Sequence, residues 1–357
     1  MHMDLFPGLP ADMALECLVR VPYQHFSSVS SVSRGWKREI ELPEFWRYRK
    51  ASGLTRNVIV LARARVDPNR EQGLKKYDAA PVYCLTVFEP KTGCWAKLPP
   101  IPGYSDGLPM VCQLVGVGLN LVVMGGLDPV TWEASNGVFV YDFISATWRR
   151  GADMPGSRRL FFACASDSDR MVFVAGGHGG EKCALKSTMA YDVVRNEWAH
   201  MPDMARERDE PKGVWYRGKF HVIGGYPTNG QGRFETGAES FDIATWHWGP
   251  VEEDFLDVAV CPRNCADSGD RKLVMSRGAD MVVREGSTWR AVVEMPLEVR
   301  NTTYVTAWEG KVLVIGSHGF GAPYKTFVLD LKSCKWERVD AEDKFSGHVQ
   351  SGCCMEL

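Results

Sequence analysis

The sequence predicts a small all-α head over residues 1–50, followed by an all-β propeller over residues 51–357. Two observations predict this architecture. The first fifty residues carry apolar side chains at helical spacing, and the remainder repeats one order of apolar run, Gly-Gly, Tyr-Asp, Trp and Met-Pro. We expect about six four-stranded blades, closed by the C-terminal strand.

The composition is that of an ordered globular protein with little charge bias. Formal net charge is -2, from 42 basic and 44 acidic side chains, so no overall field favours nucleic acid or an anionic membrane. No basic segment followed by an apolar one opens the chain, and glycines interrupt its most apolar stretches. The 11 cysteines lack paired Cys-x-x-Cys spacing, which favours reduced thiols over zinc ligands. We expect a protein of the cytoplasm, the nucleus or both, with no metal and no cofactor.

The first expected helix begins at Leu9-Pro10, because proline suits a first helical turn. It ends before Val21-Pro22, because the residue preceding a proline avoids the α region. Its apolar residues recur at helical spacing: Ala11, Ala14, Leu15, Leu18 and Val19.

Two shorter helices follow in the head. One carries Phe26 and Val29, the next runs from Val32 toward Ile40, and residues 42–46 close the segment. Three short helices in about forty residues cannot bury this much apolar surface among themselves. The face left over implies a partner.

One stretch, residues 171–202, sets the pattern for the rest of the chain. Its landmarks are Gly176-Gly177, Tyr191-Asp192, Trp198 and Met201-Pro202. The second glycine precedes the tryptophan by 21 residues here and by 22 in the copy that begins at Gly125-Gly126. In the copy after Gly224-Gly225 the tryptophan is Trp246, 21 residues on, or Trp248. Weaker copies begin near residues 58, 273 and 312, so six copies recur at a period of roughly 40–60 residues.

Each copy reads as a four-stranded antiparallel meander. Short runs of β-branched and aromatic residues between turn residues are typical of strands. Arg217-Gly218-Lys219 and Glu309-Gly310-Lys311 are expected hairpin turns between the first and second strands of a copy. A lone sheet of this kind exposes both faces, so the sheets stack radially, with the repeated tryptophan packing one sheet on the next.

The propeller is expected to close through its C-terminal segment. In the first copy, residues 50–52 lead directly toward the second strand, so the first strand is missing. Residues 346–357 lie beyond the last tryptophan and include the strand-like run His348–Ser351. If this segment supplies the missing strand, two open sheet edges disappear.

The loops between second and third strands and the loops between blades emerge on one face of such a propeller. They carry arginine and aromatic side chains, which commonly anchor protein interfaces. The substrate-binding candidates are Arg158, Arg206, Arg208, Tyr226, Arg233, Phe234, Arg300 and His318. An alternative is that Arg158, Arg206 and Arg300, at similar offsets after Met-Pro, brace the blades. Acidic residues between Glu207 and Glu210 argue against a surface that follows nucleic-acid phosphates.

Four short motifs of the head stand at characteristic distances: Leu9-Pro10, Leu15–Leu18, Val32-Ser33-Arg34-x-Trp36 and Pro43-x-Phe45. Over roughly residues 5–46 they resemble the F-box, although Ser33 replaces the family's usual cysteine. The resemblance implies docking on the Skp1 adaptor of a cullin-RING ubiquitin ligase. The docking residues it implies are Leu9, Pro10, Leu15, Leu18, Val21, Pro22, Val29, Val32 and Trp36. An alternative is that the helices merely cap the propeller.

The order Gly-Gly, Tyr-Asp, Trp resembles the kelch repeat, with three clear and three weaker copies. With the run Leu9–Leu18 and Trp36, the chain resembles plant kelch-repeat F-box proteins. This resemblance implies a substrate-recognition adaptor of an SCF (Skp1–cullin–F-box) ubiquitin ligase, whose propeller binds a protein for ubiquitination and proteasomal degradation. A subgroup of the family binds phenylalanine ammonia-lyase or type-B response regulators. We expect the lyase, and with it negative control of phenylpropanoid synthesis.

No catalytic residue is assigned, because no Lys-Ser/Thr follows the glycines of residues 176–180 and no Ser/His/Asp order stands out. Two other functions remain as alternatives. One is a kelch interaction scaffold without a ligase role. The other is a kelch-type metalloenzyme, because Glu253-x3-Asp257-x3-Cys261 resembles the E-x3-D-x3-H iron site of specifier proteins, with cysteine in the histidine position.

Overall fold

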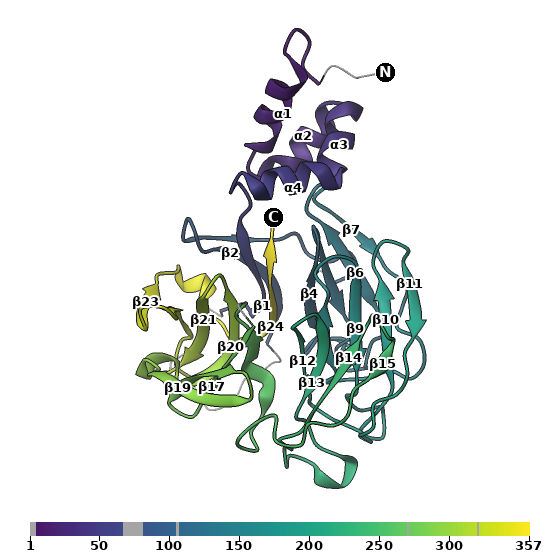
Figure 1. Cartoon of the computed structure of the whole chain (residues 1–357), viewed down its shortest axis with the longest axis vertical. Coiled ribbons are helices and arrows are strands. Elements are labelled where there is room, and N and C mark those ends of the chain that lie inside the picture. The colour runs from purple at the N-terminus through teal and green to yellow at the C-terminus, as the bar shows by residue number, and fades with distance from the viewer. Residues whose placement is uncertain (1–4, 67–80, 105–106, 270, 320) are drawn as a thin grey trace.

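Residues 5–51 fold into a helical head that stands on one end of a β-propeller (Figure 1). The computed structural model describes residues 5–66, 81–104, 107–269, 271–319 and 321–357. The helices of the head are α1 Ala11–Val19, the 3-10 helix η1 Tyr23–His25, α2 Phe26–Val32, α3 Arg34–Glu41 and α4 Pro43–Ala51. No helix within these described ranges is long and apolar enough to cross a membrane.

Helix α4 stands where the sequence pattern predicts only a closing segment. Leu42 is extended, with φ −72° and ψ 137°, and Pro43 begins the new helix in a position where its missing N–H group is not needed. The guanidinium of Arg49, only 2% exposed, donates to the carbonyl of Val21 at 2.8 Å. The fourth helix therefore holds the end of the first.

The described part of the propeller contains six four-stranded antiparallel sheets, as the repeats predict. Blade one is β24 Val349–Glu356, β1 Asn57–Ala64, β2 Tyr83–Glu89 and β3 Cys94–Lys97. Blade two is β4 Gln113–Val117, β5 Asn120–Met124, β6 Val138–Asp142 and β7 Thr147–Arg150. Blade three is β8 Ala163–Ser166, β9 Met171–Ala175, β10 Thr188–Asp192 and β11 Glu197–His200.

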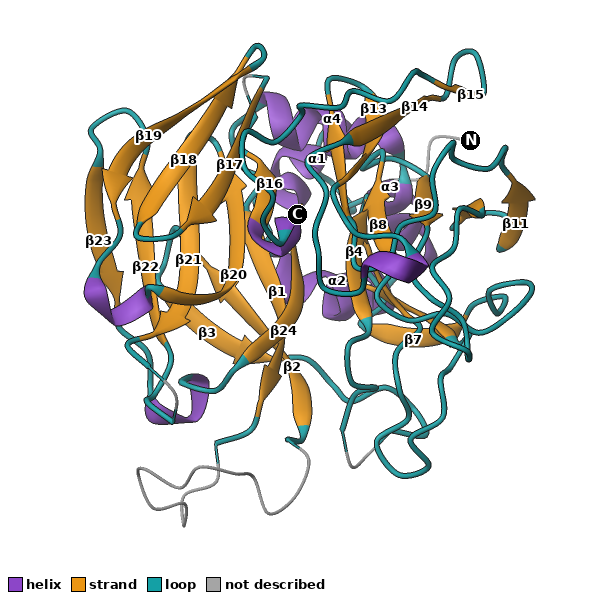
Figure 2. Cartoon of the chain, turned by 90° about the horizontal axis from the view of Figure 1, so that it is seen from below, coloured by secondary structure: helices purple, strands orange, loops and turns teal. Residues whose placement is uncertain are grey.

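The remaining three blades follow in chain order around the axis (Figure 2). Blade four is β12 Lys212–Tyr216, β13 Lys219–Ile223, β14 Ala238–Asp242 and β15 His247–Trp248. Blade five is β16 Cys265–Asp267, β17 Lys272–Arg277, β18 Asp280–Glu285 and β19 Thr288–Glu294. Blade six is β20 Asn301–Trp308, β21 Lys311–Ser317, β22 Lys325–Asp330 and β23 Lys335–Val339.

The C-terminal strand closes the ring, as expected. Strand β24 pairs antiparallel with β1, from Asn57 opposite Glu356 to Ala62 opposite Ser351. Just before β24, the carbonyl of His348 accepts the amide of Ala64 at 2.8 Å. Blade one therefore joins the two ends of the propeller chain through a hydrogen-bonded ladder, which removes two free edges.

In blades two to six the repeated tryptophan links each blade to the chain that precedes it. The indole N–H of Trp198 donates to the carbonyl of Ala152 at 2.8 Å, and that of Trp336 to the carbonyl of Glu294 at 2.9 Å. In blade four this role belongs to Trp248, whose indole donates to Pro202 at 2.7 Å. Trp246, the other candidate, lies in the turn between β14 and β15. The indoles thus combine apolar packing with a satisfied polar group.

The glycine pairs permit close approach of the inter-blade loops to the ends of the second strands. Gly176 and Gly177 both have positive φ, 65° and 80°. A side chain at Gly177 would collide with the backbone carbonyl of Leu160, which belongs to the loop entering the same blade. Only glycine combines this backbone conformation with this contact at no cost.

The head stands on blades one and two, at the end of the propeller where the short turns emerge, which we call the turn face. It consists of the first-to-second and third-to-fourth strand turns, including residues 118–119, 143–146, 193–196 and 243–246. Ile144 and Leu119 of blade two join the buried cluster of the head, together with Leu18, Ile40 and Phe45.

Polar and aromatic contacts add to this interface. The side-chain amide of Gln24 donates to Glu89 at 3.1 Å, and the rings of Tyr23 and Phe143 pack edge to face at 6.2 Å. The opposite end, away from the head, carries the long loops and is called the loop face (Figures 1 and 2). It consists of residues 125–137, 176–187, 224–237, 318–319 and 321–324, with the inter-blade loops 151–162, 201–211, 249–264 and 295–300.

Candidate functional site

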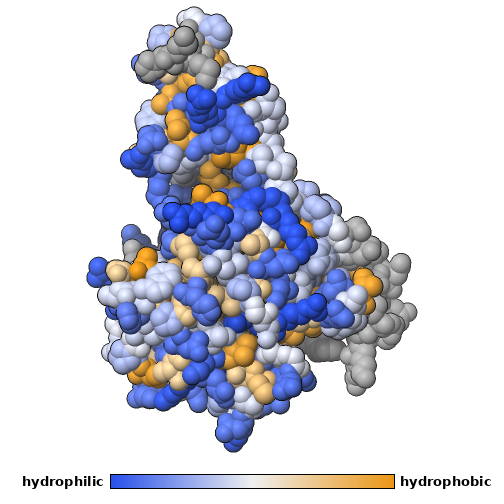
Figure 3. All heavy atoms as spheres, turned by 90° about the vertical axis from the view of Figure 1, so that its right-hand side faces the viewer, coloured by the Kyte–Doolittle hydropathy of each residue, from blue (hydrophilic) through white to orange (hydrophobic). Residues whose placement is uncertain are grey.

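Helix α1 has two apolar stripes, one turned inward and one outward. Ala14 and Leu18, four residues apart, are buried in the head. Met13 is 55% exposed, and Pro10 and Cys17, at helical spacing from it, are also exposed. An exposed apolar stripe on a small helical unit is a common feature of protein interaction sites. Figure 3 shows apolar surface on the head above a largely polar side of the propeller.

The residues expected to dock on Skp1 differ in exposure. Pro10, Pro22 and Val32 are exposed, whereas Leu9, Leu15, Val21, Val29 and Trp36 are half-buried. Leu18 is 1% exposed and belongs to the core of the head, so its side chain has no surface to offer a partner, and its place in the docking set is corrected.

Trp36 has a structural function within the head. Its indole N–H donates to the carbonyl of Leu5 at 2.5 Å, and its ring packs on Phe6 with centroids 4.5 Å apart. Ser33 caps helix α3 by accepting the amide of Trp36 at 3.1 Å, the contact expected of an N-cap serine. Trp36 therefore ties the segment before α1 to α3.

Sequence reasoning missed part of the exposed surface of the head. Met13, Leu42 and Tyr48 are 55%, 37% and 42% exposed. The signal for Met13 was present, because Pro10, Met13 and Cys17 repeat at helical spacing along a stripe beside Ala14. Leu42 and Tyr48 depend on helix α4, which the sequence analysis did not predict.

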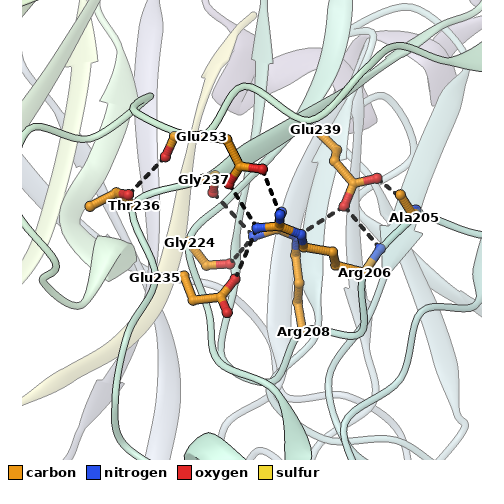
Figure 4. A network of polar contacts seen from close by, with 9 residues as sticks. All are labelled: Ala205, Arg206, Arg208, Gly224, Glu235, Thr236, Gly237, Glu239 and Glu253. Carbon is orange, nitrogen blue, oxygen red and sulfur yellow. Dashed lines mark hydrogen bonds and ion pairs between the residues drawn. The ribbon is translucent and has the colours of Figure 1, made fainter.

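On the loop face, several of the predicted arginines are engaged in ion pairs. Arg206 contacts Glu253 through both terminal nitrogens, at 2.9 and 2.6 Å, and lies 3.7 Å from Glu235 (Figure 4). Arg158 pairs with Glu133 at 3.1 Å. The arginines present exposed, partly neutralised charges rather than a basic cluster.

Arg208 is fully buried and braces blades three and four. Its guanidinium donates to the carbonyls of Gly224 at 2.7 Å and Gly237 at 3.1 Å (Figure 4). Arg159, one blade earlier, makes the equivalent bonds to Gly176 at 3.2 Å and Ser187 at 3.1 Å. The assignment of Arg208 to substrate binding is therefore corrected: its side chain serves the bracing role considered for its neighbours.

Tyr226 is also corrected, because it is only 6% exposed. Its hydroxyl donates to Glu210 at 3.0 Å, and its ring packs edge to face on half-buried Phe234 at 5.3 Å. Burial, reinforced by the neighbouring carboxylates, raises the pKa of the Tyr226 phenol, which therefore stays protonated. This pair supports the loop of blade four from within.

The other candidates remain on the surface, on separate loops. Arg233 and His318 are exposed on second-to-third strand loops of blades four and six. Arg300 is exposed after blade five and pairs with Glu294. The structure brings Arg206 and Arg208 together around Glu239 but leaves Arg158, Arg233, Arg300 and His318 spread around the loop face.

The spacing that suggested an iron site does not form one cluster. Glu253 pairs with Arg206 at 2.6 Å, and Asp257 pairs with Arg277. Across the described ranges, no three histidine, cysteine or acidic residues lie close enough together to hold a metal ion.

Comparison with known proteins agrees with both parts of this architecture. The F-box domain model matches residues 6–48, and the kelch motif model matches residues 112–155 and 158–205. The F-box/kelch-repeat protein At1g80440 of Arabidopsis thaliana is 48% identical over 362 residues, covering 99% of this chain and 100% of that protein. The chain belongs to the F-box/kelch-repeat proteins.

Other plant F-box/kelch-repeat proteins are similar over most of their length. At1g15670 of the same plant is 46% identical, with 99% of this chain and 100% of its own covered. SKIP20 is 34% identical, covering 73% of this chain and 69% of its own. F-box domains generally bind Skp1 and kelch propellers bind protein substrates, so this domain composition supports the general role of an SCF substrate-recognition adaptor.

Proposed function

We propose that this F-box/kelch-repeat protein delivers phenylalanine ammonia-lyase to an SCF ubiquitin ligase, in the cytoplasm, the nucleus or both. The head would dock on Skp1 through Leu9, Pro10 and Val32, together with Met13. The loop face would hold the substrate through Arg158, Arg206, Arg233, Arg300, His318 and half-buried Phe234. Degradation of the lyase would reduce flux into phenylpropanoid synthesis.

One observation carries this proposal: the head is packed on the turn face, opposite the loop face. Ile144 of blade two is 7% exposed because it lies in the core of the head. The start and the end of the propeller chain also meet here. The amide of Arg56 donates to the carbonyl of Leu357 at 2.6 Å, and the amide of Leu357 donates to the carbonyl of Arg56 at 2.8 Å. A fixed head keeps one face free for substrate and raises the effective concentration of bound substrate near the ligase.

The plant subgroup that this chain resembles binds phenylalanine ammonia-lyase or type-B response regulators, so the resemblance supports both substrates. Both proteins are therefore included in the test. Tagged full-length chain is expressed in plant cells under proteasome inhibition, and the captured lyase and response regulators are quantified. Capture of the lyase, lost when Arg206, Arg233 and Arg300 are replaced by alanine, is the expected result. Capture of response regulators alone would reject the lyase.

Docking on the ligase is tested with the head. Leu9→Ala with Pro10→Ala, or Met13→Glu alone, should abolish co-purification of Skp1 while substrate capture persists. Arg47→Ala is the matched control, because that side chain is 73% exposed on α4 and pairs only with its neighbour Glu44. If the head variants change no partner, the chain is an interaction scaffold without a ligase role.

A further inference from the structure

The most exposed apolar side chains of the loop face lie at one loop tip. Val130 is 75% exposed and Trp132 is 58% exposed, both in the loop between β5 and β6 of blade two. Tryptophan is enriched among residues that dominate binding energy, because its ring supplies a large rigid contact area. Exposure of two large apolar side chains, Val130 and Trp132, on one short turn indicates a contact site.

This loop tip is held rigidly by Asp128. One carboxylate oxygen of Asp128 accepts the amides of Val130 and Thr131, each at 2.9 Å. The Asp128 carbonyl accepts the amide of Trp132 at 2.9 Å, and Trp132 has a positive φ of 60°. A bulky residue in this conformation is unusual and persists only where its surroundings impose it. The turn presents Trp132 already ordered, which reduces the entropy lost on binding.

A polar hollow of about 380 Å³ lies beside this turn, bordered also by Tyr104 of the preceding inter-blade loop. Its wall contains two arginines, each with its own acidic partner: Arg150 contacts both oxygens of Asp153 at 2.9 Å, and Arg158 pairs with Glu133. Asp128 also lines the hollow and has no cationic partner within the described ranges. The charge left unmatched in the hollow is therefore negative.

Asn136 adds a second unmatched acceptor to the same wall. Its side-chain N–H donates to the carbonyl of Gly156 at 3.2 Å, which fixes the orientation of the amide. Its oxygen, Oδ1, is buried and has no hydrogen-bond partner among the described residues. This unpaired carbonyl oxygen adds partial negative charge to the wall of the hollow.

We propose that Trp132 and the adjacent hollow bind a surface segment of the protein substrate in which a large apolar side chain neighbours a lysine or arginine. The apolar side chain packs on Trp132 and Val130. The cation enters the hollow and faces the Asp128 carboxylate. An acidic segment would instead meet the carboxylates of Asp128, Glu133 and Asp153. This inference rests on the loop face being the substrate face.

The probe for this site is a random peptide library displayed on phage and selected on the immobilised full-length chain. Selected peptides should pair a large apolar residue with lysine or arginine. They should bind the Trp132→Ala and Asp128→Asn variants about tenfold more weakly, the loss of roughly one good contact. The Asp128→Asn variant keeps a side-chain oxygen that can accept the amides of Val130 and Thr131, and it removes only the negative charge of residue 128.

Trp246→Ala is the matched control variant. Trp246 is also a surface tryptophan with positive φ, 58°, but it lies on the turn face, so its removal should leave peptide affinity unchanged. Enrichment of acidic peptides, binding that is unaffected by Trp132→Ala, or no enrichment at all would overturn the proposal. Capture of the lyase that depends on Arg206, Arg233 and Arg300 but not on Trp132 would leave the proposed function standing and reject this site alone.

Discussion

Arg208 and Glu239 form an ion pair in which both side chains are completely buried, with Nε 3.2 Å from Oε1. Arg208 belongs to the loop that enters blade four, and Glu239 to strand β14 of that blade. Glu239 also accepts the amide of Ala205 at 2.7 Å, so it organises the loop at two points. Arg208, which the sequence pattern assigned to a binding surface, therefore stabilises the interior of blade four.

Replacing Arg208 by alanine should destabilise the propeller severely. The change leaves the Glu239 carboxylate buried without its cation, which typically costs about 3–5 kcal/mol. Urea unfolding followed by tryptophan fluorescence measures the loss. Arg206→Ala is the control, because the Arg206 side chain is 40% exposed and its pairing should contribute at most about 1 kcal/mol. Equal effects of the two variants would contradict this interpretation.

Closure of the ring can be weakened at Gly347. A side chain there would collide with the backbone carbonyl of Ala64, at the point where the closing segment meets β1. Gly347→Val should lower the free energy of unfolding by about 1–3 kcal/mol or more through overpacking. Gly319→Val has open space around it and negative or extended φ, so it should be nearly neutral.

Deleting residues 346–357 tests the same closure more drastically. The deletion removes β24 and exposes the edge of β1, so the chain should unfold or aggregate. Thermal melting and size-exclusion chromatography report the two outcomes. An unchanged melting temperature would show that the C-terminal strand is dispensable for closure.

Ile144→Ser should loosen the head from the propeller. Ile144 is 7% exposed between the two parts, and burial of such a side chain contributes about 1.5–3 kcal/mol. Hydrogen exchange measured by mass spectrometry should rise in α1 to α4 and remain unchanged in blades three to six. Val194→Ser is the matched control, because Val194 occupies the equivalent turn of blade three and is 76% exposed. Faster exchange throughout the propeller would instead indicate global destabilisation.

Acid should destabilise the closing segment through His348. Burial lowers the pKa of His348 to about 4, and its ring nitrogen contacts the Tyr83 hydroxyl at 2.9 Å. Unfolded histidine titrates near 6.5, so between these values the unfolded chain binds more protons. Stability is therefore lost as pH falls from about 6.5 to 4, by roughly 3 kcal/mol for this group.

The pH dependence is checked by urea unfolding at several pH values. His348→Gln should flatten the curve between about pH 6.5 and 4, whereas His25→Gln, an exposed residue of the head, should not. His221, whose pKa burial also lowers to about 4, contributes in the same direction and leaves a residual slope. A wild-type curve that is flat over this range would disprove the assignment.

The elements that could be predicted are those whose signal repeats. Gly176-Gly177 and Trp198 recur at nearly constant spacing, because every blade must solve the same packing problem. The missing first strand of blade one then predicted the role of residues 346–357, which β24 confirms. Helix α4 occurs once, so no second copy marked it, and the sequence pattern predicts only a closing segment at residues 42–46.

The side-chain roles on the loop face could not be predicted from residue type. Arg206 and Arg208 are two positions apart in the sequence, yet one is partly exposed and the other is fully buried. Tyrosine is a residue type that is common in protein interfaces, but the Tyr226 side chain is buried and packs against Phe234. Inward and outward positions in a loop depend on contacts with neighbouring blades, which no local spacing encodes.

By itself the sequence determined the period, the approximate number of blades and the order of the two parts, because periodic apolar and glycine positions report local strand geometry. Only the tertiary structure decided which face the head covers and which polar side chains remain available. Those properties arise from contacts between residues far apart in the chain, such as Ile144 with Leu18 and Arg208 with Glu239. The loop face is therefore the candidate binding surface for two reasons: the head leaves it uncovered, and its own loops carry exposed side chains.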